Sequence, residues 1–167
     1  MDTLKLATEW AKEEANASKF FILFGILFII ATIVFKQFGK TDVAKAFVIP
    51  TFVAGILLLI LGFGLVYSNS SKLKNYPTAY QKDASAFVTT EIANAQKTIE
   101  GYKRAVFRVM PSLIIVCALL LIFINKPIWR AIGVTTIAML IVIILVDSNA
   151  IARLEAYKKQ LELVEKR

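Results

Sequence analysis

Long apolar blocks separated by short polar segments are the dominant pattern along this chain. A helix needs about 20 mainly apolar residues to cross roughly 30 Å of hydrocarbon at about 1.5 Å per residue. Four stretches reach or approach this length, at residues 20–35, 46–67, 105–124 and 128–146. The pattern therefore predicts an all-α integral membrane protein with four transmembrane helices.

The polar segments outside these stretches carry a second pattern, which predicts cytoplasmic amphipathic helices. From residue 88 to 109 and from 150 to 164, apolar residues recur in alternating steps of four and three, the spacing of a helix that packs lengthwise on another. Two interpretations are open: these helices pack on each other inside one protomer, or a seam binds another protein or a second copy. The seam residues that we expect to bind a partner are Val88, Ile92, Ile99, Tyr102, Leu154, Tyr157, Leu161 and Val164.

The order of the elements divides the chain into two similar parts. Residues 1–67 hold an N-terminal cytoplasmic helix and the first two spans, and residues 83–167 hold a central cytoplasmic helix, the last two spans and a C-terminal cytoplasmic helix. Ser, Asn and Pro residues in the intervening segment 68–82 predict a non-helical linker. Pro111 predicts a kink or a local break where the central helix enters the third span.

The basic residues indicate how the four spans are oriented. Of the 20 Lys and Arg residues, 15 lie in the N-terminal segment, the central segment and the C-terminal tail, and five lie in the two short connections. The positive-inside rule then predicts cytoplasmic termini, with the bacterial inner membrane as the favoured location. Because Glu9 and Glu13 precede the first stretch, we expect an uncleaved span and not a signal peptide.

Composition restricts the chemistry that the chain can perform. Hydrophobic residues make up 57% of the chain and charged residues 19%, whereas about 25% charged residues is usual in soluble domains. The sequence has no His and a single Cys, Cys117, which excludes imidazole catalysis, His-ligated metals and an intrachain disulfide. We therefore expect no enzymatic activity and no cofactor. The net charge of +8 fits attraction to anionic headgroups, and because basic and acidic residues are interleaved, no nucleic acid is expected as a partner.

Small and polar residues within or beside the spans suggest specific contacts. Gly55 and Gly62 are seven residues apart on one helix face, where we expect close helix packing. Asp147 follows the fourth span and is expected to end the membrane region, with a proton or cation site as the alternative. Trp10 and Trp129 are expected to be anchors at the membrane interfaces.

These features favour a binding function over a catalytic one. The preferred hypothesis is a structural or accessory subunit that lies in the lipid bilayer and presents its cytoplasmic helices to a protein partner or to a second copy. An oligomeric channel or transporter lined by Thr32, Thr135 and Thr136 is one alternative. Another is an immunity-type protein that blocks a membrane-inserting toxin by pairing with its helices.

Overall fold

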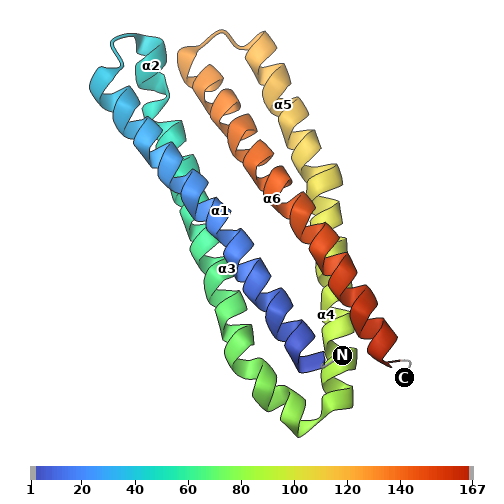
Figure 1. Ribbon diagram of the computed structural model, residues 1–167. Helices are drawn as coiled ribbons and strands as arrows, with labels where there is room; N and C mark the ends of the chain where they lie inside the picture. Colours follow the sequence, from blue (N-terminus) through green and yellow to red (C-terminus); the bar gives the residue numbers. More distant parts are fainter. Residues whose placement is uncertain (1–2, 166–167) are drawn as a thin grey trace.

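The chain folds into long helices arranged as two hairpins that lie side by side (Figure 1). A computed structural model describes residues 3–165, and all regular structure within that range is helical. One hairpin pairs α1 with α3, and the other pairs α6 with the continuous run of α4, η1 and α5. The elements are α1 (Thr3–Phe38), α2 (Asp42–Ala46), α3 (Val48–Lys82), α4 (Ala84–Arg104), the π-helical turn η1 (Ala105–Val109), α5 (Met110–Phe123) and α6 (Pro127–Glu165).

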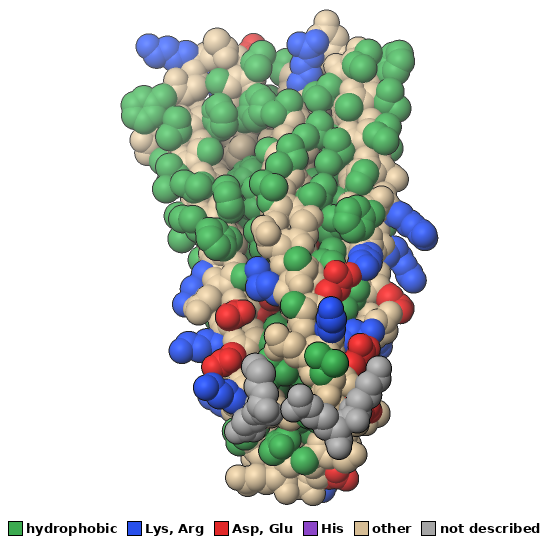
Figure 2. Space-filling model, turned by 45° about the vertical axis from the view of Figure 1, so that its right-hand side comes forward, with side chains coloured by type: hydrophobic (Ala, Val, Ile, Leu, Met, Phe, Trp, Pro, Cys, Tyr) green, Lys and Arg blue, Asp and Glu red, His purple; other side chains and the backbone are tan. Residues whose placement is uncertain are grey.

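The molecule separates along its length into an apolar half and a charged half. Four helical segments are long and apolar enough to cross a membrane, which confirms the all-helical prediction with four candidate spans. Figure 2 shows hydrophobic side chains covering one half and Lys, Arg, Asp and Glu gathered on the other. We call residues 20–67 and 105–146 the apolar half, and residues 3–19, 68–104 and 147–165 the charged half.

The prediction of a non-helical linker over residues 68–82 was wrong, because α3 continues unbroken to Lys82. Pro77 lies inside this helix, where its missing N–H leaves one backbone hydrogen bond unmade. Leu73, Tyr76 and Tyr80 recur on one face of the segment and pack into the core of the charged half. This tertiary packing overrides the local preference of Ser, Asn and Pro for turns.

The expected break near Pro111 is present as the turn η1, which joins α4 to α5 without interrupting the helical path. The N–H of Met110 donates to the carbonyl of Ala105, one residue further back than in an α-helix. A proline at position 111 has no N–H and would crowd the carbonyl of Phe107, so the wider turn relieves the clash. The fourth candidate span and the amphipathic tail that follows it form one helix, α6, which runs to Glu165.

The most extensive helix contact joins α1 and α3, and glycines allow the two backbones to approach closely. A Cβ atom added at Gly62 would lie 2.9 Å from the backbone nitrogen of Ile22, and one added at Gly55 would lie 3.1 Å from the carbonyl oxygen of Gly25. Gly55 and Gly62 thus both lie at this contact. Further along it, the hydroxyls of Thr32 and Thr51 are hydrogen-bonded to each other at 2.9 Å.

A separate hydrophobic core fills the charged half. The buried residues come from all four long helical elements, and Leu161 and Ala11 are completely inaccessible to solvent. The core therefore makes the charged half a packed bundle in its own right. Its buried members are Leu6, Ala7, Ala11, Tyr76, Phe87, Val88, Ala95, Ile99, Leu154, Tyr157 and Leu161.

The close approach of α1 and α3 predicts different effects for two alanine substitutions in α3. Gly62→Ala places a methyl group against the backbone of α1, whereas a Cβ at Gly64 has no atom within 4 Å. Both changes add the same helix propensity, so their difference reports packing alone. We expect Gly62→Ala to destabilise the protein by about 1–3 kcal/mol relative to Gly64→Ala. Thermal unfolding in mild detergent measures this, and equal melting temperatures for the two variants would contradict the packing.

Candidate functional site

A cleft between α3 and α4 is the principal hollow of the charged half. The two helices meet at a one-residue turn at Asp83, whose carboxylate accepts a hydrogen bond of 2.9 Å from the N–H of Ala86. From this turn they diverge toward the apolar half (Figure 1) and enclose a cleft of about 830 Å³. The side chains that line it are Tyr67, Ser68, Ser71, Lys72, Asn75, Tyr76, Ala79, Lys82, Asp83, Ala86, Phe87, Thr90 and Glu91.

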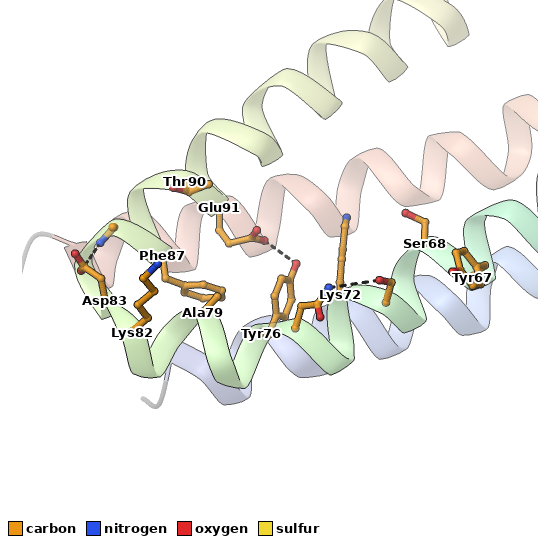
Figure 3. Close-up of a pocket in the computed structure, with 13 residues that line it drawn as sticks. Tyr67, Ser68, Lys72, Tyr76, Ala79, Lys82, Asp83, Phe87, Thr90 and Glu91 are labelled. Atoms are coloured by element: carbon orange, nitrogen blue, oxygen red, sulfur yellow. Dashed lines mark hydrogen bonds between the residues drawn. The ribbon is translucent and has the colours of Figure 1, made fainter.

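A carboxylate held by two phenols lies on the floor of the cleft. Tyr76 donates a hydrogen bond of 2.7 Å to Oε2 of Glu91, and Tyr157 donates one of 3.2 Å to the same oxygen (Figure 3 shows the first). Burial, and then the negative charge of Glu91, raise the pKa of both tyrosines well above its ordinary value. Both phenols therefore stay protonated and keep donating. Glu91 links α3, α4 and α6 in this way.

Aromatic stacking adds α1 to the same group. The ring of Trp10 stacks on that of Tyr157 with centroids 4.7 Å apart and an angle of 7° between the planes. Trp10 also contacts Lys72, whose Nζ lies 4.7 Å from the centroid of the Trp10 ring, within the range of a cation–π contact. Phe87 packs edge-on against Tyr76, with ring centroids 5.3 Å apart. One connected cluster therefore ties all four long helical elements together beside the cleft.

A second charged group lies where the charged half meets the apolar half. Nε and Nη2 of Arg153 donate hydrogen bonds of 3.3 and 3.0 Å to Oε2 of Glu14. Asp147 lies near this pair, and burial, followed by the charge of Glu14, raises the pKa of its carboxyl from 3.8 to about 6. Burial and then the charge of Asp147 also raise the pKa of Tyr102 to about 12. The junction thus holds one ion pair and one carboxyl that is easily protonated.

The structure places the predicted seam residues inside the chain. Val88, Ile99, Leu154, Tyr157 and Leu161 are buried in the charged-half core, and Ile92 packs against that core. Tyr102 and Val164 are half-buried. A partner would reach these residues only by displacing the helices that cover them, and their role in partner binding stays a prediction.

The threonines considered as pore-lining residues are also internal. The hydroxyl of Thr32 bonds to that of Thr51, so it is engaged between α1 and α3. Thr135 and Thr136 line an apolar pocket of about 270 Å³ between α3 and α6. Cys117 is buried in α5.

Sequence reasoning missed several members of the site. Trp10 was expected at a membrane interface, but it stacks inside the charged half. Tyr76 lay in the segment taken for a linker, and so it received no role. The only local signal for Glu91 was its position three residues after Val88, on the apolar face of α4 where a carboxylate is out of place.

No protein-family model, curated protein or solved structure matches the chain. The two carboxylates of the cleft are engaged, by phenols at Glu91 and by a backbone N–H at Asp83. Ammonium and hydroxyl groups of α3 remain available there, so the arrangement is suited to binding.

The raised pKa of Asp147 predicts how stability depends on pH. Between about pH 4 and pH 6 the unfolded chain loses the proton of this carboxyl while the folded chain keeps it, so the free energy of unfolding falls as the pH rises. Asp147→Asn has no carboxyl group at this position and so removes this loss of stability at high pH. We expect the variant to melt higher than the wild type at pH 7.5, with a smaller difference at pH 4.5.

Measuring both proteins in one detergent at both pH values cancels the contributions of titrating groups that do not interact with Asp147. A melting difference that does not change with pH would show that Asp147 is not destabilised by its surroundings.

Proposed function

We propose that this chain is a non-enzymatic four-span membrane protein that acts as a structural or accessory subunit and binds a protein partner through its charged half. One observation carries the proposal. About 20 residues suffice to cross a membrane, yet α1, α3 and α6 have 36, 35 and 39 residues. The additional length packs into a bundle with its own core on one side. Crossing a membrane does not require such an extension. Presenting a rigid surface to a partner outside the membrane requires folded structure there, which the extension supplies.

We further propose that the charged half and both termini lie in the cytoplasm, in a bacterial inner membrane. Support comes from the basic residues, 15 of which belong to the termini and the central segment and five to the two short connections. The connections between α1 and α3 and between α5 and α6 would then face the opposite side.

The outward surface of α4 and α6 is the part of the charged half best suited to a protein partner, because the seam residues are covered. A groove of about 440 Å³ runs between these helices, and charges of both signs alternate along it. Such alternation selects partners and fixes their register, because like charges brought together cost several kcal/mol. Lys103 and Glu155 pair across the groove at 2.6 Å. Its other charged residues are Glu100, Lys158, Lys159 and Glu162.

Purification of the tagged protein from its native membrane in mild detergent tests the proposal. We expect a heteromeric complex, and we expect Glu100→Lys combined with Glu162→Lys to reduce the co-purified partner by about tenfold or more. The melting temperature of the chain itself should change little, because Glu100 is exposed and the ion pair of the half-buried Glu162 with Lys158 lies near the surface, where such pairs contribute about 0–1 kcal/mol. The matched control is Glu9→Lys with Glu13→Lys, which makes the same change of charge on α1, outside the groove.

Equal loss of the partner in the control would show that overall charge, and not the groove, is responsible. A homo-oligomer that conducts ions in liposomes would contradict the accessory role, and so would a chain that stays a lone monomer in native membranes.

A further inference from the structure

We propose that the end of the α3–α4 cleft nearest the apolar half binds the phosphate of an anionic phospholipid. The inference is independent of any protein partner, because it concerns α3 and the leaflet that would surround it. It rests on the polar side chains of α3 that line the cleft, on the absence of a carboxylate paired with Lys72 within residues 3–165, and on the position of these side chains just beyond the apolar stretch of α3.

Four polar side chains form a stripe along α3 at the entrance of the cleft. Ser68, Ser71, Lys72 and Asn75 are spaced at i, i+3, i+4 and i+7, which places them on one helix face, and all four line the cleft. Figure 3 shows Ser68 and Lys72 in this order beyond Tyr67, followed by Tyr76. The stripe supplies an ammonium, two hydroxyls and an amide, all of which can donate to phosphate oxygens.

The ammonium and the two hydroxyls keep protons that they can donate, although Nζ of Lys72 also lies over the ring of Trp10, whereas the carboxylates of the cleft already accept hydrogen bonds. Within residues 3–165, Lys72 has no carboxylate at ion-pair distance, and the hydroxyl of Ser68 makes no hydrogen bond. Ser71 accepts a 3.5 Å bond from Asn75 and keeps its own proton free to donate. Glu91 and Asp83 are already bound to phenols and to a backbone N–H. A ligand rich in acceptors therefore complements the cleft better than one rich in donors.

Position along α3 separates the donors from the carboxylates. Ser68 lies eight residues before Tyr76, or about 12 Å along the helix axis, and Lys72 lies four residues before it, or about 6 Å. Ser68 is therefore well separated from Glu91, whereas Lys72 and Glu91 line one small pocket. At the turn, the charge of Lys82 offsets that of Asp83. The entrance itself therefore carries a net positive charge from Lys72. An anion at Ser68 would therefore lie nearer to the ammonium of Lys72 than to the carboxylate of Glu91.

The depth of the stripe matches that of lipid headgroups. Tyr67 ends the apolar stretch of α3, is 79% exposed, and begins the lining of the cleft. Tyrosine is typical of the membrane–water interface, and basic residues just beyond a span attract anionic lipids. A phosphate at Ser68, Ser71 and Lys72 would leave its acyl chains beside the apolar half. The wall of the cleft also offers apolar surface at Ala79, Ala86 and Phe87, so a bound protein segment is the outcome that the test below must exclude.

Native mass spectrometry of the purified full chain in neutral detergent tests the proposal, with dioleoyl phosphatidylglycerol as the probe and dioleoyl phosphatidylcholine as the comparison. We expect one phosphatidylglycerol to bind with an apparent Kd about tenfold lower than that of phosphatidylcholine. Lys72→Ala should raise the Kd for phosphatidylglycerol about tenfold, as expected for loss of a charge-assisted hydrogen bond. Lys74→Ala removes the same charge two residues away, at an exposed position outside the cleft, and should change the Kd less than about twofold.

Because the ammonium of Lys72 also contacts the ring of Trp10, Lys72→Ala could weaken folding as well as lipid binding, and a second variant separates the two effects. Ser68→Ala combined with Ser71→Ala leaves that contact intact and should weaken phosphatidylglycerol binding severalfold with an unchanged melting temperature.

Three results would overturn the proposal. Equal effects of Lys72→Ala and Lys74→Ala would show attraction to the whole surface. Displacement of the lipid by millimolar inorganic phosphate would assign the site to free phosphate. Co-purification of a protein whose presence prevents phosphatidylglycerol from binding would assign the cleft to a protein segment.

Discussion

The need to satisfy backbone hydrogen bonds inside each helix is the constraint on which the rest of this structure depends. In hydrocarbon no water is available to N–H and C=O groups, so a span must be an unbroken helix. Here the helices also continue into the charged half, α3 through Pro77 and α5 through η1 into α4. The rotation of each helix about its own axis is therefore the same in both halves. The glycine contact between α1 and α3 consequently fixes which faces of these helices meet at Trp10 and Lys72.

The half-buried carboxylate of Glu91 explains how the charged half achieves a specific arrangement. Withdrawing a carboxylate from water is costly unless it is hydrogen-bonded, and two phenols from different helices supply those bonds. The arrangement that satisfies Glu91 also brings Tyr157 against Trp10 and Tyr76 against Phe87. These contacts occupy the apolar seams and leave accessible the charged groove outside α4 and α6 and the donor stripe at the entrance of the α3–α4 cleft. The proposed protein and lipid contacts follow from that division.

The sequence predicts the helices well and their contacts poorly, for a physical reason. Apolar blocks and the four-and-three spacing are local properties, so the four long helices and the identity of Leu154, Leu161 and Ile99 as an apolar stripe could be predicted. Which element covers that stripe depends on the arrangement of helices distant in sequence. Residues 68–82 were taken for a linker because local propensity favours turns, while the core contacts of Tyr76 that make them helical involve Phe87 on the next helix. Glu91 and Tyr157 are 66 residues apart, and no spacing connects them.

The most direct test of this account asks on which side of the membrane the charged half lies. Single cysteines at Lys40, Asn125 and Ser85, in a background without Cys117, occupy exposed positions at opposite ends of the molecule. In intact cells, an impermeant maleimide should label the cysteines at Lys40 and Asn125, and should label the one at Ser85 only after permeabilisation. Labelling at Ser85 in intact cells would contradict the proposed orientation, and equal labelling at all three positions would contradict the four spans.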